Sequence, residues 1–295
     1  MRTTTRYLTR DGRSTLVAYG LRRRWYEDLY HLVLTASWWR FIAGVVGLYL
    51  AVNLLFGALY AEIGGIENLA RGAFLDGVFF SVQTIGTIGY GRLVPVSVAA
   101  NLLVAFESLV GLLGFALATS LMFAKFSRPT SRVLWSKVAV VTTWEGVPAL
   151  LFRMANERGN QVVEAQLRVA LLLSDTTLEG QSIRRIYDLR LVRSQSPFFA
   201  LTWTAIHPLA GDSPLANRTQ EDLRAARAEI VASLTGIDET LMQTIHSRHV
   251  YGVEDIVWNA RFADVIGAMP DGRQGVDYGK FHDIVPTDPA PAARA

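Results

Sequence analysis

Two long apolar runs constrain the fold of this chain more than any other feature of its sequence. Residues 41–61 contain one strongly polar member, Asn53, and a helix of this length spans about 31 Å, roughly the thickness of a bilayer core. Residues 98–124 form a second run, which would span about 40 Å as a helix. Two such runs so close together fit membrane-spanning helices better than a buried helical hairpin of a soluble protein.

The composition agrees with a membrane segment. The chain has 51% hydrophobic and 19% charged residues, against about 25% charged residues in a typical soluble domain. The many large apolar residues exclude a disordered chain, and the absence of cysteine excludes a disulfide-stapled secreted module. The 26 arginines and three lysines would by themselves allow binding to nucleic acid or to anionic lipid.

The positions of the cationic residues predict the orientation of the spans. Eight arginines precede the first span, and Lys125, Arg128, Arg132 and Lys137 follow the second. The segment between the spans has two arginines together with three acidic residues. The positive-inside rule therefore places both termini in the cytoplasm, and it explains the arginines near the spans without nucleic acid.

A shorter apolar stretch lies between the two spans, within residues 62–97. Residues 73–85 are too few to cross a bilayer and predict a re-entrant helix, with Asp76 in the first turn, where the helix dipole favours a carboxylate. Non-helical backbone is tolerated at membrane depth only where it is buried in protein or lines a water-filled path. The residues after this helix are therefore candidates for the wall of a pore.

The motif Thr87-Ile88-Gly89-Tyr90-Gly91 follows the expected re-entrant helix and resembles the selectivity filter of potassium channels. In such a filter successive backbone carbonyl oxygens, here those of Thr87 to Tyr90, replace the hydration shell of K⁺, and the Thr87 hydroxyl adds a further oxygen. Gly89 and Gly91 supply the backbone freedom that this arrangement requires. The resemblance implies that K⁺ is the permeant ion and that the Tyr90 ring packs against the pore helix, and no organic cofactor is expected.

Nearly the whole chain, about residues 16–285, resembles the prokaryotic branch of the inward-rectifier potassium channels (KirBac). The segments that carry this resemblance are residues 25–31 (WYEDLYH), 81–92, 196–203 (SPFFALTW), 207–208, 212–215, 247–249, 255–258 and 277–282. The resemblance implies a homotetrameric K⁺ channel with voltage-independent gating in a bacterial inner membrane, and not an enzyme. One chain supplies one strand of the filter, so four chains must surround the pore axis.

The resemblance and the sequence pattern together predict a membrane α-helical part and a C-terminal all-β part. The expected regions are a cytoplasmic N-terminus with an interfacial slide helix in residues 1–40, a transmembrane pore domain in 41–126, a cytoplasmic immunoglobulin-like domain in 127–285 and a disordered tail, rich in proline and alanine, in 286–295. Strand-like segments separated by turn residues favour a β-sandwich. They are residues 138–141, 149–154, 162–173, 183–191, 198–203, 229–235 and 256–262, and residues 221–228 are expected to form a short helix.

An amphipathic helix is predicted before the first span, because residues 24–36 separate into two faces at helical spacing. The apolar face comprises Trp25, Leu29, Leu32, Val33 and Ala36. The polar face comprises Arg24, Glu27, Asp28, His31 and Thr35. Such a helix either lies on the inner leaflet, as the slide helix of the family does, or packs on the cytoplasmic domain.

Cationic residues next to the spans are candidate ligands for anionic lipid. They are Arg22, Arg23, Arg24, Lys125, Arg128 and Arg132. The resemblance implies sensitivity to phosphoinositides, which is typically inhibitory in prokaryotic members. The alternative is that these residues only set the topology.

The second span is expected to line the pore and to contain its gate. Gly111 and Gly114 interrupt it, either as a hinge for gating or to allow close helix packing. Phe123 matches the narrow hydrophobic constriction of the family, where four phenylalanine rings would stop ions by dewetting. Leu121 or Met122 could share this role.

Three further residues are candidates for tuning conduction. Glu107 is an ionisable residue within a span, so it either acts on the filter or cavity or is a buried carboxyl that holds the pore helix. Phe115 occupies the position where many inward rectifiers have an acidic residue that binds polyamines or Mg²⁺, so strong rectification is not expected. Gln83 stands where eukaryotic members have a glutamate that braces the filter through an ion pair.

Two other functions fit part of the pattern. Gly86 precedes the filter and is unusually small, which would suit a less selective cation channel. A non-conducting membrane sensor with a ligand-binding tail is the alternative from another class. Enzyme chemistry is not indicated, because the sequence has no phosphate-binding loop and its histidines lack the spacing of a metal site. We expect structural roles for His207, His246, His249 and His282.

Overall fold

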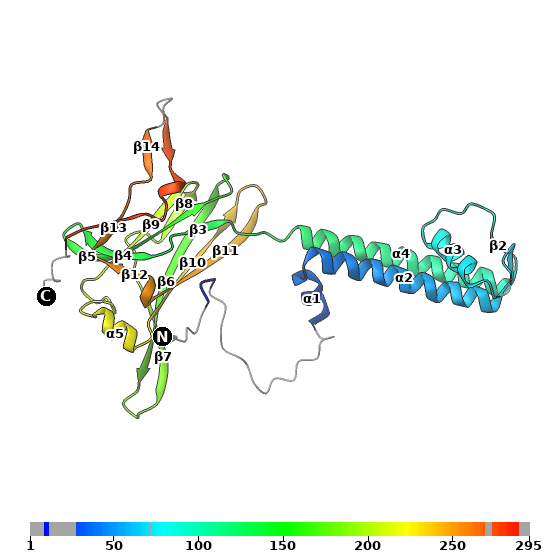
Figure 1. The fold of residues 1–295 in the computed structure, drawn as a ribbon, viewed down its shortest axis with the longest axis horizontal. Helices are drawn as coiled ribbons and strands as arrows, with labels where there is room; N and C mark the ends of the chain where they lie inside the picture. The colour runs from blue at the N-terminus through cyan, green and yellow to red at the C-terminus, as the bar shows by residue number, and fades with distance from the viewer. Residues whose placement is uncertain (1–8, 12–27, 71, 269–272, 289–295) are drawn as a thin grey trace. The chain divides into compact units, whose positions relative to one another are not determined.

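The chain separates into two compact units, one within residues 20–128 and the other formed by residues 1–19 together with 129–295 (Figure 1). The first is mainly helical and the second is built mainly of β-strands. The residues described by the computed structural model are 9–11, 28–70, 72–268 and 273–288.

Two long helices frame the helical unit. Helix α2 spans Trp38–Ile63 and helix α4 spans Val98–Phe126, so each extends a few residues past the predicted apolar run. Only 17% of the most apolar stretch of α2, and 6% of that of α4, is buried within the chain. Helices that are both this apolar and this exposed are not core helices of a soluble domain, and they confirm the prediction of two membrane-spanning helices.

Shorter elements fill the segment between the two long helices. Helix α3 spans Phe74–Ile85, where the re-entrant helix was predicted, and Asp76 lies in its first turn. Strands β1 (Ile66–Glu67) and β2 (Val94–Pro95) pair in antiparallel orientation. This ribbon therefore joins the two sides of the connecting segment.

Helix α1 spans Leu29–Thr35 and covers the last part of the predicted slide helix. Arg24, Trp25 and Glu27 lie outside the described residues. On the predicted apolar face, Leu29 and Leu32 are 46% and 58% exposed, whereas Val33 and Ala36 are partly buried. This face is therefore only partly covered.

Helices α2 and α3 approach each other closely at two glycines. A Cβ atom added at Gly57 would lie 2.5 Å from Val78 Cγ2, and one added at Gly77 would lie 2.5 Å from the Gly57 carbonyl oxygen. Small residues of this kind let helix backbones pack closely in a bilayer. The apolar core of the unit comprises Phe56, Tyr60, Ile66, Phe80 and Ala100.

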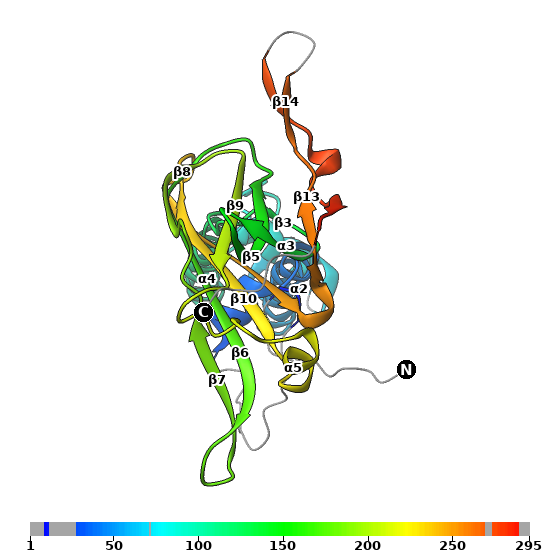
Figure 2. The same cartoon turned by 90° about the vertical axis from the view of Figure 1, so that its left-hand side faces the viewer.

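The second unit contains two five-stranded sheets. Figure 2 shows strands of both, among them β6, β7 and β10 of one and β3, β5 and β9 of the other. The strands of one sheet are β6 (Val162–Thr176), β7 (Ser182–Asp188), β8 (Gln195–Phe199), β10 (Glu229–Asp238) and β11 (Gln243–Gly252). The strands of the other are β3 (Val133–Trp135), β4 (Ala139–Trp144), β5 (Val147–Asn156), β9 (Thr202–Pro208) and β12 (Ile256–Trp258). The order is β11-β10-β6-β7 in the first, with β8 on β6, and β12-β4-β5-β3 in the second, with β9 on β5. The pairing of β4 with β12 is parallel, and the other pairs are antiparallel.

Side chains from both sheets share one hydrophobic core, so the unit is a β-sandwich. Strands β6 and β10 alternate buried with more exposed side chains over much of their length, as expected when one face is buried. Leu167 and Leu171 of β6, Ile230 and Leu234 of β10, and Phe152 of β5 are all buried in this core. The prediction of a β-rich C-terminal domain is therefore confirmed.

Smaller elements complete the unit. Two further ribbons pair β13 with β16 and β14 with β15. These strands are β13 (Ala260–Phe262), β14 (Ile266–Ala268), β15 (Gln274–Val276) and β16 (Ile284–Pro286). The unit also contains helix α5 (Gln220–Ala225) and two 3₁₀ turns, Val253–Asp255 and Tyr278–Lys280.

Several predicted strands have different bounds in the structure. The predicted strand 198–203 is two strands, because β8 ends on one sheet and β9 begins on the other. The predicted strand 256–262 is interrupted at Asn259, which has a left-handed φ of 55°. Strand β7 ends at Asp188, before the predicted end at Leu191. Strand β11 was not predicted, because its burial alternates over only part of its length.

The predicted helix 221–228 and the predicted tail also differ from the structure. Helix α5 ends at Ala225, and a capping box between Thr219 and Asp222 fixes its start. Pro286 belongs to strand β16, and the Thr287 N–H donates to the Asn259 carbonyl at 2.9 Å. The first two residues of the predicted tail are therefore part of the folded unit, because backbone pairing holds them there.

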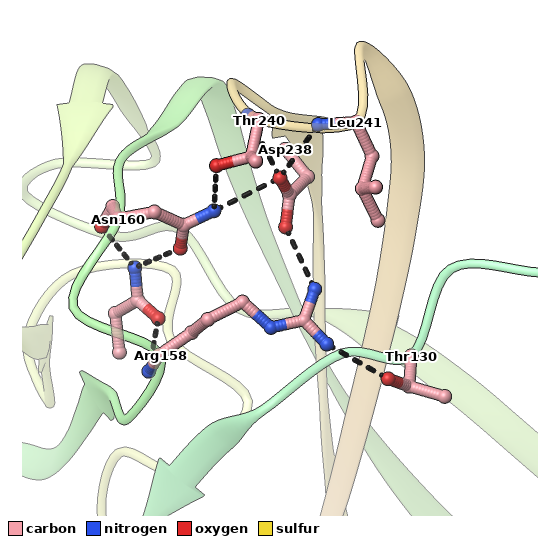
Figure 3. Close-up of polar contacts among 7 residues, drawn as sticks. Thr130, Arg158, Asn160, Asp238, Thr240 and Leu241 are labelled. Carbon is pink, nitrogen blue, oxygen red and sulfur yellow. Dashed lines mark hydrogen bonds and ion pairs between the residues drawn. The ribbon is translucent and has the colours of Figure 1, made fainter.

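A buried carboxylate joins two turns of the sandwich (Figure 3). Asp238, at the end of β10, is 2% exposed and accepts hydrogen bonds from Asn160 Nδ2 at 2.9 Å and from Arg158 Nη1 at 3.1 Å. The backbone N–H groups of Thr240 and Leu241 donate to the same side chain at 3.0 and 3.1 Å. The β5–β6 turn is thereby tied to the β10–β11 turn.

Arg158 also reaches the segment that precedes β3. Its Nη2 atom donates to Thr130 Oγ1 at 2.8 Å (Figure 3). The backbone N–H of Glu157 donates to the Arg132 carbonyl at 3.0 Å. Residues 130–132 are therefore fixed to the β5–β6 turn.

Candidate selectivity filter and gate

The predicted filter motif follows α3 directly. The Thr87 N–H donates to the Thr84 carbonyl at 3.1 Å, and the Ile88 N–H donates to the Gln83 carbonyl at 2.9 Å. These two bonds fix the start of the motif to the last turn of α3. Gln83 thus contributes its backbone to the entry of the motif.

Left-handed backbone occurs at every second residue of the motif. The φ angle is 53° at Thr87, 57° at Gly89 and 78° at Gly91. Alternating left-handed and ordinary residues turn successive carbonyl groups toward one side, whereas in an extended strand they point to opposite sides. Glycine adopts such angles without cost, but a β-branched threonine at positive φ is strained by roughly 1–3 kcal/mol. Strain of this kind is concentrated at functional sites.

Gly86 is small for a packing reason. A Cβ atom at this position would lie 2.8 Å from the Val82 carbonyl oxygen, which accepts the Gly86 N–H at 2.9 Å. The end of α3 is therefore too crowded for a side chain here. The small residue does not indicate a loosened filter.

The side chains of the motif are open within one chain. Ile88 is 49% exposed and Tyr90 is 76% exposed. The Tyr90 ring was predicted to pack against the pore helix. In the single chain it does not do so, because most of its surface is exposed. Partners for both side chains must come from outside this chain if they are to be buried.

Glu107 of α4 is fully buried, with 0% of its surface exposed. The Tyr60 hydroxyl donates to Glu107 Oε2 at 2.5 Å, and the Ser81 hydroxyl contacts Glu107 Oε1. The Ser81 hydroxyl also lies 3.0 Å from Asn53 Oδ1. Because these residues belong to α2, α3 and α4, the cluster fastens the pore helix to both long helices. The geometry favours the interpretation of Glu107 as a buried carboxyl that holds the pore helix.

The partners of Glu107 were not identified as a site from the sequence. A usable signal was present, since Asn53 is the one strongly polar residue of the first span and Ser81 lies within the re-entrant helix. A polar group at membrane depth needs a hydrogen-bonding partner. Which of them would meet Glu107 depends on how the three helices pack.

The two glycines of the predicted hinge differ in their surroundings. A Cβ atom at Gly111 would lie 3.1 Å from Ile85 Cγ2, whereas one at Gly114 would have no neighbour within 4 Å. Gly111 therefore allows close packing against the end of α3. No packing contact explains Gly114, so a hinge remains our prediction for this glycine.

The predicted gate residues lie near the end of α4. Phe115 and Phe123 are separated by eight residues, or about 80° of helical rotation, and they are 75% and 74% exposed. Met122 is 44% exposed, and Leu121 is partly buried. Phe123 therefore presents the largest free apolar surface among the predicted gate residues.

The candidate lipid ligands also differ from one another. Arg22, Arg23 and Arg24 lie outside the described residues. Arg128 and Arg132 are exposed, whereas Lys125 is only 9% exposed and its ammonium group contacts backbone carbonyls. Lys125 was predicted as a lipid ligand, but in this structure its ammonium group points into the protein.

Comparison with known proteins defines the class of this protein. Residues 36–128 match the family described as "Ion channel", and residues 133–295 match the family described as "Inward rectifier potassium channel C-terminal domain". The first range covers most of the helical unit and the second covers the β-sandwich. The chain is therefore a membrane ion channel and not an enzyme.

Individual relatives agree with this class. The chain is 46% identical over 281 residues to the inward rectifier potassium channel Kirbac3.1 of Paramagnetospirillum magnetotacticum, and the match covers 95% of both proteins. It is 29% identical over 316 residues to the G protein-activated inward rectifier potassium channel 3 of Mus musculus, covering 98% of this chain and 80% of the relative. It is 30% identical over 300 residues to the G protein-activated inward rectifier potassium channel 1 of Bos taurus, covering 97% of this chain and 58% of the relative.

The chain belongs to the inward rectifier potassium channel family. It is an inward rectifier potassium channel with two transmembrane helices, as the sequence predicted, and its permeant ion is K⁺.

Proposed function

We propose that four copies of this chain form a channel that conducts K⁺ passively through the carbonyl oxygens of residues 87–90 and the Thr87 hydroxyl. Channels of this family are tetramers. The observation that carries the proposal is the left-handed backbone at Thr87, Gly89 and Gly91 directly after the pore helix. Four such strands around one axis would supply rings of oxygen atoms in place of the hydration shell of the ion. The exposure of Tyr90 fits burial of its ring by a neighbouring copy.

The proposed gate is a ring of Phe123 side chains at the cytoplasmic end of the pore, with Leu121 and Met122 next to it. Gly114 acts as the hinge of α4: a Cβ atom there would have no neighbour within 4 Å, so packing within the chain does not explain this glycine. The cytoplasmic domain acts on this gate through residues 127–132, the segment that connects α4 to β3. Hydrogen bonds of this segment to Arg158 and Glu157 support such a coupling.

The channel lies in a bacterial inner membrane, with both termini in the cytoplasm, and anionic lipid modulates it. The exposed Arg132 supports lipid binding at the cytoplasmic surface, and Arg128 is exposed as well, although its Nη1 atom donates to the Leu34 carbonyl at 2.9 Å. The predicted ligands Arg22, Arg23 and Arg24 would add to the same basic surface.

Ion flux from liposomes that contain the purified protein tests this function. We expect K⁺ flux well above Na⁺ flux, and loss of K⁺ flux on Gly89→Ala, because alanine resists the φ of 57° at this position. Gly44→Ala is the matched control, since a Cβ atom there meets no atom within 4 Å and the residue lies in helix α2.

Other outcomes would select the alternatives. Equal Na⁺ and K⁺ flux would point to a less selective cation channel. No flux in any lipid composition would favour a membrane sensor that does not conduct. The first alternative has lost its main support, because the small Gly86 is explained by packing at the end of α3.

A further inference from the structure

The outer end of the filter motif is held by a side chain from the other side of the connecting segment. Asn68 Nδ2 donates a hydrogen bond to the Arg92 carbonyl at 2.9 Å, and Arg92 directly follows Gly91, the last residue of the motif. In the part of the chain that the structure describes, Asn68 is the one side chain that donates to the backbone between the motif and strand β2.

The other end of the motif is fixed by the pore helix, through the Thr87 and Ile88 N–H groups. Between the two ends, Gly89 and Gly91 have left-handed φ angles of 57° and 78°. Glycine permits these angles but also permits many others, so a glycine-rich strand keeps one conformation only when its surroundings fix it. Fixation at both ends restricts this strand more than fixation at one end.

Asn68 is itself held in a defined place. It follows strand β1, whose Ile66 is buried in the same apolar core as Phe80 of the pore helix. Leu69, directly after Asn68, also packs against this core. The φ of Asn68 is 62°, a left-handed angle that asparagine tolerates better than most residues with a side chain. One core therefore fixes the positions of both the pore helix and Asn68.

The amide of Asn68 is suited to this contact by its chemistry. Its Nδ2 atom is a donor, so it holds a carbonyl oxygen without adding charge near the motif. Among the described residues, no side chain donates to the carbonyl groups of residues 87–90, which stay available to the ion.

We propose that Asn68 is a positioning residue for the filter, which holds the outer end of the motif through the Arg92 carbonyl. The inference rests on the proposed function of residues 87–91 as the filter. Loss of this hydrogen bond lowers the fraction of channels whose filter is able to bind K⁺, so the apparent affinity for K⁺ falls. Bound K⁺ stabilises the conducting filter by mass action, so high K⁺ compensates for the loss.

The K⁺ dependence of thermal stability tests this role without conduction. The purified channel is heated in detergent while K⁺ replaces Na⁺ at a constant, high total salt concentration. In Asn68→Gly we expect the K⁺ concentration for half-maximal stabilisation to rise about fivefold, the effect of losing one neutral hydrogen bond. Glycine tolerates the φ of 62°, so this variant removes the side chain without straining the backbone.

The variant Asn68→Asp separates the donor from the space that the side chain fills. Aspartate has nearly the same shape, but its carboxylate does not donate to a carbonyl, and high salt screens its added charge. We expect the same rise as in Asn68→Gly. If Asn68→Asp behaves as the wild type while Asn68→Gly does not, the side chain only fills space and the proposal is overturned.

The matched control is Asn101→Asp. Asn101 is another exposed asparagine, in the first turn of α4, and its Nδ2 atom donates to the Pro95 and Ser97 carbonyls at 3.1 and 2.9 Å. These carbonyls lie outside the filter motif, so we expect an unchanged K⁺ midpoint. A shift equal to that of Asn68→Asp would show that the effect is not specific to Asn68, and it would overturn the proposal.

Ion flux from liposomes gives a second readout. At low K⁺ we expect K⁺ flux of Asn68→Gly about fivefold below that of the wild type, and at high K⁺ we expect similar flux. A reduction that is the same at every K⁺ concentration would indicate fewer folded channels and would overturn the positioning role.

The two measurements distinguish failure of the inference from failure of the proposed function. If the wild-type protein shows K⁺ flux and stabilisation by K⁺, but Asn68→Gly leaves the K⁺ midpoint unchanged, only the role of Asn68 is overturned. If the wild-type protein shows neither, the proposed filter fails and the inference fails with it.

Discussion

Single ionisable residues in the membrane part of this chain have partners inside the protein. Glu107 is held by Tyr60 and Ser81, and Lys125 is held by carbonyls and aromatic rings. Sequence reasoning treats both residues as functional candidates, because charges at membrane depth are costly. In this structure, contacts between helices compensate for the cost of placing these ionisable groups at membrane depth. Each residue therefore stabilises the arrangement of the pore elements.

Substitution of Glu107 separates a structural role from an electrostatic one. Glu107→Ala would leave the buried Tyr60 hydroxyl without its partner and would leave the Ser81 hydroxyl only Asn53 as a partner. We expect it to lower the free energy of unfolding by about 3 kcal/mol. Glu107→Gln keeps one acceptor and should cost less. Thermal unfolding of the purified channel in detergent measures both effects.

The exposed Glu62, at the end of α2, provides the control for charge. Glu62→Gln should leave stability unchanged. If Glu107 instead acts through its field on the filter, Glu107→Gln would change the ratio of K⁺ to Na⁺ flux while its stability stays at the wild-type level.

Among the secondary-structure elements, helix α4 differs between its sides: one packs within the chain and another is exposed. One side carries Glu107, Gly111 and Lys125, which pack against other elements of the helical unit. Phe123 lies on the opposite side, Phe115 lies between the two sides, and both are exposed in the single chain. One side of α4 is therefore covered by its own chain, while the other exposes apolar side chains. Such a helix is suited to assemble with further copies, since apolar contacts between copies can cover the exposed side.

The open side of α4 leads to a prediction for the gate. Phe123→Ala would remove the bulk that closes the pore by dewetting, so we expect resting K⁺ flux from liposomes to rise at least severalfold. Leu117→Ala, six residues earlier and on another side of α4, is a comparable loss of exposed apolar surface and should leave flux near the wild-type level. Equal effects of the two substitutions, or no effect of Phe123→Ala in a closed channel, would contradict the gate.

At the scale of the molecule, the β-sandwich depends on a polar anchor as well as on its apolar core. Burial alone would raise the pKa of Asp238, but hydrogen bonds from Asn160, from the backbone of Leu241 and Thr240, and from Arg158 together hold this pKa below its ordinary value. The charged form is therefore the stable form in the fold. This anchor also reaches Thr130, so the same carboxylate orders the beginning of the domain.

The lowered pKa of Asp238 predicts a pH dependence of stability. Because the pKa is lower in the folded than in the unfolded state, the stabilisation is complete above the unfolded value of about 4 and is lost as pH falls through the folded value. Asp238→Asn should lower the free energy of unfolding by about 3 kcal/mol at pH 7. The difference between wild type and variant should shrink below pH of about 4.

Unfolding followed by tryptophan fluorescence at pH 7 and at acidic pH measures this difference. Asp264→Asn is the control, since the side chain of Asp264 is 92% exposed. A difference between wild type and Asp238→Asn that stays constant with pH would show that the charge of Asp238 does not carry the stabilisation.

Elements with a local signal can be predicted from the order of the amino acids. The two spans, the re-entrant helix and most strands of the sandwich follow from apolar run length and periodicity, and Gly89 and Gly91 mark the left-handed positions of the filter motif. Contacts between distant residues depend on how the elements pack in three dimensions. Tyr60, Ser81 and Glu107 lie far apart in the chain, so their contact depends on how α2, α3 and α4 pack. The same holds for Lys125, which the sequence predicts as a lipid ligand. Its partners in the structure are backbone carbonyls at the end of α1. Every residue carries such a carbonyl, so no sequence pattern could identify these partners.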